Sequence, residues 1–209
     1  FHPGSAAQNG LVAALLASRN FTSSDAGIEA KSGWANVVST EQKYGEITGE
    51  LGSRFEAALN SYKPFACGIV IHPTIDACIQ LRNQYRLTAS QIDRIDLRVH
   101  PLVLELTGKR TPQTGLDGKF SVYFAAAVAV VRGAGGVAEF SDEATNDTEI
   151  VALRDRVTTT VDPSIAQDQV RAVITLKDGR RLEKYIEHAV GSVDDELAEL
   201  VGVPLDLLE

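Results

Sequence analysis

The stretch VRAVITLKDGRRLEKYIE, residues 170–187, carries the clearest sign of the fold. Every second residue from Val170 to Leu176 is apolar, and a period of two is typical of a half-buried strand. The dipeptide Asp178-Gly179 suits the centre of a tight hairpin turn, so a return strand is expected directly after it. The stretch therefore predicts two neighbouring antiparallel strands.

Two further strands are expected earlier, where apolar residues alternate over 95–99 and β-branched residues run over 157–161. Before residue 60 the pattern changes, because small apolar residues recur at helical spacing over residues 5–18. The fold class is therefore expected to be α+β with a small, mostly antiparallel sheet. The predicted domains are a helical portion over residues 1–60, an α+β domain over 61–190 and a C-terminal helical segment over 191–209.

Two helices are expected inside the α+β domain. Pro73 suits the first residue of a helix that His72 would cap. The nearly all-apolar run after Lys119 predicts a buried helix that stops at Gly133. The polar residues 107–118 before it are expected to form a loop.

The composition excludes several classes of protein. The 209 residues include 28 acidic and 20 basic side chains, giving a net charge of −8, and no basic block suggests nucleic-acid binding. No apolar run approaches the roughly 18 residues of a membrane helix, and no signal segment is visible. The two cysteines suit reduced thiols, so we expect a cytoplasmic protein. The sequence has no methionine, even at position 1, and we therefore expect a processed piece or part of a longer product.

One non-helical segment concentrates reactive side chains. Lys63, Cys67, Gly68 and His72 lie within ten residues of each other. A lysine in a partly buried turn can pair with substrate carboxylates, and a glycine lets a ligand approach the backbone. The alternative is structural, with Lys63 solvated, Cys67 in the core and His72 as a helix cap. No metal-ligand spacing and no phosphate-binding motif is visible, so no metal is expected.

Two more cations are candidates for anion binding. His2 precedes the first helix, whose free N–H groups attract anions. Lys119 would begin the buried apolar helix, where a cation opposes the helix dipole and so serves no purpose in helix stability. Each has a plain alternative, a turn into a helix for His2 and a surface lysine for Lys119.

The chain resembles the MmgE/PrpD family, which includes 2-methylcitrate dehydratase, cis-aconitate decarboxylase and iminodisuccinate epimerase. The resemblance rests on four blocks that occur in the family's order. They are FHPGSAAQNG at residues 1–10, KPFACG with HP at 63–73, GKFSVYFA at 118–125, and the strand ending in Lys-Asp-Gly at 173–179.

The resemblance implies the end of an all-helical domain followed by an α+β lid domain, with the active site between them. Lys63 matches a lysine of the substrate pocket, and His2 matches a histidine beside a pocket lysine. We therefore expect Lys63 and His2 as catalytic residues, with Lys63, Cys67, Gly68, His72 and Lys119 binding the substrate. Gly68 falls where the decarboxylase branch carries a histidine, which argues against a decarboxylase.

The expected function is that of a lyase portion acting on a small polycarboxylate, similar to 2-methylcitrate dehydratase and free of cofactors. Two alternatives stay open. One is an isomerase similar to iminodisuccinate epimerase. The other is a truncated, non-catalytic relative that associates with another chain, because the apolar face of residues 5–18 needs a partner. A homodimer is expected.

Overall fold

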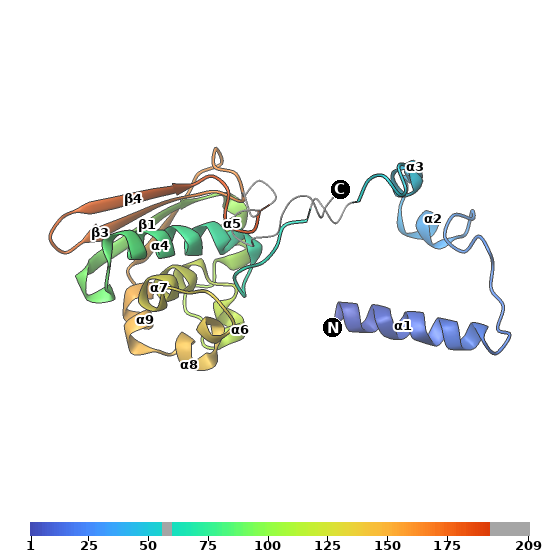
Figure 1. The fold of residues 1–209 in the computed structure, drawn as a ribbon, viewed down its shortest axis with the longest axis horizontal. Coiled ribbons are helices and arrows are strands. Elements are labelled where there is room, and N and C mark those ends of the chain that lie inside the picture. The colour runs from blue at the N-terminus through green and yellow to red at the C-terminus, as the bar shows by residue number, and fades with distance from the viewer. Residues whose placement is uncertain (56–59, 193–209) are drawn as a thin grey trace. The chain divides into compact units, whose positions relative to one another are not determined.

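The computed structural model describes residues 1–55 and 60–192, and its described residues separate into two units (Figure 1). The first unit covers residues 1–55 and the second covers the rest. The expected C-terminal segment lies outside the described residues, apart from Gly191 and Ser192.

The first unit is helical and has no core of its own. Among residues 1–55 only Gly33 is buried, and the apolar face of the first helix is exposed within this unit. The first helix begins at His2 and not at residue 5, because Pro3 lies in its first turn, where proline is tolerated. The helices of the unit are α1 (His2–Ala17), α2 (Trp34–Val38) and α3 (Gly45–Thr48).

The second unit confirms the α+β class. Its four strands lie in the order β2-β1-β3-β4, with β1 parallel to β2 and antiparallel to β3, and β3 antiparallel to β4. The strands are β1 (Ile92–Val99), β2 (Val157–Val161), β3 (Val170–Leu176) and β4 (Arg181–Ile186). Two of the three pairings are antiparallel, in agreement with the expected mostly antiparallel sheet, and the pair β3–β4 is the hairpin that the Asp178-Gly179 turn predicted.

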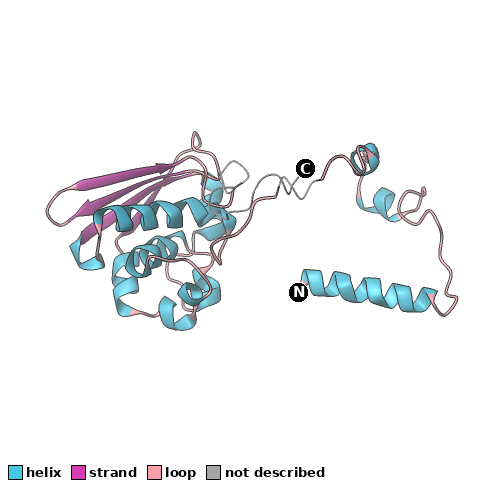
Figure 2. Cartoon of the chain, in the orientation of Figure 1, coloured by secondary structure: helices cyan, strands magenta, loops and turns pink. Residues whose placement is uncertain are grey.

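Helices cover one face of this sheet (Figure 2). Ile95 lies opposite Val157 and Ile174 in register, and all three are fully buried on that face. Contacts with the strands come from α4 (His72–Tyr85) and α7 (Val122–Arg132). The unit also contains α5 (Pro101–Thr107), α6 (Gly115–Gly118), α8 (Asp142–Thr145) and α9 (Thr148–Arg154). Short 3-10 turns lie at Ile69–Ile71, Ala89–Gln91 and Ala138–Phe140.

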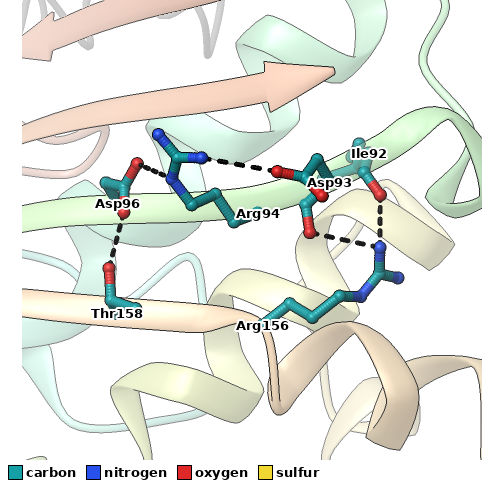
Figure 3. Close-up of polar contacts among 6 residues, drawn as sticks. All are labelled: Ile92, Asp93, Arg94, Asp96, Arg156 and Thr158. Carbon is teal, nitrogen blue, oxygen red and sulfur yellow. Dashed lines mark hydrogen bonds and ion pairs between the residues drawn. The ribbon is translucent and has the colours of Figure 1, made fainter. Parts of the chain in front are cut away.

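An arginine supports the start of the central strand, where the pairing with β3 is irregular between Ile92 and Arg94. The Arg156 guanidinium donates to the carbonyl oxygens of Ile92 and Asp93 (Figure 3). Further along β1, Asp96 accepts hydrogen bonds from Arg94 and from the Thr158 hydroxyl of β2. These side chains therefore satisfy polar groups around the irregular pairing.

Two helix starts differ from the expectation. Helix α4 begins at His72 with Ile71 as its cap, so His72 is the first helical residue and not the cap. Lys119 does not begin α7, because Ser121 caps that helix through a hydrogen bond from the Phe124 N–H. The predicted stop of α7 is confirmed, since Gly133 adopts a left-handed conformation with φ of 70°.

Candidate functional site

The segment before α4 is held by backbone hydrogen bonds to distant parts of the chain. The Ala66 N–H donates to Gly135 O at 2.9 Å, and the Gly68 N–H donates to Lys119 O at 3.1 Å. The second bond places Gly68 beside the turn that precedes α7. Two stretches that are far apart in the chain thus form one surface.

An open hollow of about 420 Å³ lies where these two stretches meet. Two of its lining residues are lysines, one from each stretch, and most of the others are apolar. The lining residues are Lys63, Phe65, Ala66, Cys67, Gly68, Leu116, Lys119 and Phe120. The structure therefore brings together four of the six residues that the sequence singled out.

Lys119 reaches this hollow from the end of α6. It is the C-cap residue of that single helical turn, and its N–H donates to Gly115 O. A cation at the C-terminal end of a helix interacts favourably with the helix dipole. The expectation that Lys119 opposes the dipole of a following helix is therefore wrong, because α7 starts three residues later, at Val122.

The Cys67 thiol is a neutral part of the lining. Burial raises its pKa to about 12, although the charges of Lys63 and Lys119 act in the opposite direction. A thiol with that pKa is protonated at neutral pH, so it is not an activated nucleophile. The Lys63 ammonium donates to the Cys67 carbonyl oxygen at 3.5 Å, which anchors the lysine beside the hollow.

His72 does not line the hollow. Its ring is 2% exposed and packs edge-on against Phe65, with 5.3 Å between the ring centroids. Burial, together with the charge of Lys63, lowers its pKa to about 4, while the carbonyls of Cys67 and Phe65 act the other way. His72 is therefore neutral at pH 7, and its buried Nε2 has no hydrogen-bond partner among residues 1–55 and 60–192.

A second pocket, of about 330 Å³, has His72 in its lining. It is lined by Tyr62, Asp168 and Ser192 among others, and it shares no lysine with the first hollow. Within residues 1–55 and 60–192, no three His, Cys, Asp or Glu side chains are grouped so that they could hold a metal ion.

Of the last two candidates, His2 lies outside the hollow and Gly68 lies in its lining. His2 lies in α1, in the first unit, where its exposed ring contacts Phe1. Gly68 lines the hollow, but the position that a side chain would take faces Thr107 and the Lys119 carbonyl. Its role in admitting a ligand stays a prediction.

Sequence reasoning missed the apolar members of the lining. Leu116 and Phe120 stand at positions i and i+4 relative to each other, with Lys119 at i+3. This spacing places three side chains on one face of a helical turn. This spacing is visible in the sequence, but residues 107–118 are expected there to form a polar loop, so the spacing was not taken as a helical turn.

The sequence of this region also matches a known protein family. Residues 65–200 match the model of the MmgE/PrpD C-terminal domain. The chain therefore belongs to the MmgE/PrpD family. No curated protein matches it. In the part of the chain that the structure describes, no helix has the length and apolar character to span a membrane.

Proposed function

We propose that this chain is part of a lyase that removes water from a small polycarboxylate, with 2-methylcitrate as the substrate. Membership of the MmgE/PrpD family supports the reaction class. The observation that carries the proposal is the pair of lysines, Lys63 and Lys119, on one open hollow. Ammonium groups bind carboxylates by charge and by hydrogen bonds, so two of them suit a ligand with several carboxylates.

The reaction explains why cations are needed. A base removes a proton from the carbon next to a carboxylate, and the hydroxyl group on the neighbouring carbon leaves as water once it is protonated. A carbon–carbon double bond remains. Negative charge develops on the carboxylate beside the carbon that loses its proton, and a nearby ammonium stabilises that charge. We assign this role to Lys63 and substrate binding to Lys119, and we assign no base.

The test is a turnover assay on the purified full-length protein. 2-Methylcitrate in D₂O is followed by NMR, and we expect an unsaturated tricarboxylate to form. Lys63→Ala should lower kcat/KM by about 100-fold, the size of effect seen when one charge-stabilising group is removed. Lys177→Ala is the matched control, because Lys177 is an exposed lysine next to the hairpin turn.

The outcomes separate the alternatives. Incorporation of deuterium at the carbon next to a carboxylate without loss of water would instead indicate an isomerase. Kinetics of Lys63→Ala equal to wild type, with an unchanged circular dichroism spectrum, would exclude the role of Lys63. The absence of any turnover or exchange would favour a non-catalytic relative.

A further inference from the structure

Helix α6 packs closely against its neighbours and contributes to the lining of the hollow. Gly115 and Gly118 are its closely packed residues: a Cβ on Gly118 would lie 3.0 Å from the Phe124 ring, and one on Gly115 would collide with the Phe140 carbonyl. α6 also contacts α8 and the turn Ala138–Phe140. Leu116 of α6 lines the hollow, together with Lys119 and Phe120, which follow directly after the helix.

The turn is held firmly on both sides. At its start the Gly115 N–H donates to the Asp142 carboxylate at 2.6 Å, and the Thr114 side chain accepts from the Asp117 N–H. At its end Lys119 O accepts from the Gly68 N–H. Helix α6 and the residue that follows it are thus held in place by hydrogen bonds.

Two large apolar side chains of this region are exposed to water. Leu116 is 68% exposed and Phe120 is 47% exposed. They flank the cation of Lys119, while Phe65 and Ala66 line the hollow from the other stretch. The hollow therefore combines charge for carboxylates with an apolar wall that a purely polar ligand would leave uncovered.

We infer that Leu116 and Phe120 form an apolar subsite that selects polycarboxylates carrying an alkyl branch. This inference rests on the proposed function, because the lysines hold the carboxylates. The branch lies against Leu116 and Phe120 and removes their surface from water. Each methyl group that the subsite covers tightens binding by about three- to fourfold.

The test uses a graded set of dicarboxylates on the full-length protein. Dissociation constants for succinate, methylsuccinate and 2,2-dimethylsuccinate are measured by NMR titration. For wild type we expect the constant to fall about three- to fourfold per added methyl group. Leu116→Ser and Phe120→Ser should make the three constants nearly equal.

Two further variants make the outcome interpretable. Leu106→Ser is the matched control, because Leu106 is 51% exposed but does not line the hollow, and it should keep the wild-type preference. Lys63→Ala should weaken all three ligands about equally. It reports on carboxylate binding, and therefore on the proposed function, separately from the subsite.

Each possible result either supports the apolar subsite or overturns it. If the ligands bind in a Lys63-dependent way but show no preference for methyl groups, the apolar subsite is overturned and the lysine pair stands. The subsite is equally overturned if Leu116→Ser and Phe120→Ser keep the preference. If wild type binds none of the three, or binds them without need of Lys63, the proposed function and the subsite both fail.

Discussion

The methyl group of Thr107 occupies the space into which a side chain at Gly68 would project. A Cβ on Gly68 would lie 3.1 Å from Thr107 Cγ2, closer than ordinary van der Waals contact. Thr107 is itself fixed, because it is 1% exposed and its hydroxyl donates to Val103 O at 2.5 Å. Helix α5 and the segment before α4 therefore approach each other through a glycine.

This contact predicts that Gly68→Ala destabilises the protein by steric overlap alone. The φ of Gly68 is −62° and its ψ is 133°, which any residue adopts, so no backbone strain is added. We expect a loss of about 1–3 kcal/mol in the free energy of unfolding, as for overpacked sites, measured by urea denaturation.

Thr107→Ser provides the control for that substitution. It keeps the hydroxyl and removes the methyl group, so the pair Gly68→Ala with Thr107→Ser should recover most of the loss. Additive effects of the two changes would contradict the overlap.

His72 predicts a loss of stability at mildly acidic pH. Its pKa is about 4 in the folded protein against 6.5 as the ordinary value, because burial disfavours the charged ring. Between these values the unfolded chain binds a proton that the folded chain does not. The free energy of unfolding therefore decreases as the pH falls from 6.5 to about 4.

The measurement is urea denaturation across this pH range, with His72→Gln compared against wild type. The variant should show a flatter dependence on pH. His2→Gln is the control, because His2 is exposed, and it should keep the wild-type slope. A His72 ring resonance that titrates near pH 6.5 in the folded protein would contradict the prediction.

Arg156 predicts a specific sensitivity of the sheet. Its guanidinium donates to two carbonyls, those of Ile92 and Asp93, at the irregular start of β1. Arg156→Ala removes these two hydrogen bonds and a third, from the guanidinium to Ala152 O, and we expect a loss of about 1–3 kcal/mol in the free energy of unfolding.

The matched control is Arg180→Ala. Arg180 pairs with Asp178 at 2.8 Å in an exposed turn, and exposed ion pairs contribute about 0–1 kcal/mol. Equal losses for the two arginines, measured by the same denaturation assay, would show that Arg156 is an ordinary surface residue.

Much of the fold could be predicted because its signals are local. Alternation of apolar residues and the Asp178-Gly179 turn indicated β3 and β4, and the β-branched run indicated β2 with the bounds that the structure has. Helix starts were less certain. Lys119 was assigned to α7 because the apolar run follows it directly, whereas the hydroxyl of Ser121 decides the start by capping the helix.

The candidate site could be predicted only in part. Lys63, Cys67 and Gly68 lie in one segment, so their proximity follows from the sequence. The partnership of Lys63 with Lys119 does not, because it depends on the hydrogen bond between Gly68 and Lys119. The burial that makes His72 neutral also depends on packing, since Phe65 covers its ring.

The sequence by itself determined the α+β class and the hairpin, because periodicity and turn residues are properties of neighbouring residues. It also determined the resemblance to the family, because the order of motifs can be read along the chain. Only the tertiary structure decided which side chains share a surface. Leu116 and Phe120 line the same hollow as Lys63, while Gly115 and Gly118 of α6 pack closely against Phe140 and Phe124. Contacts between distant segments are selected by packing, which no local pattern encodes.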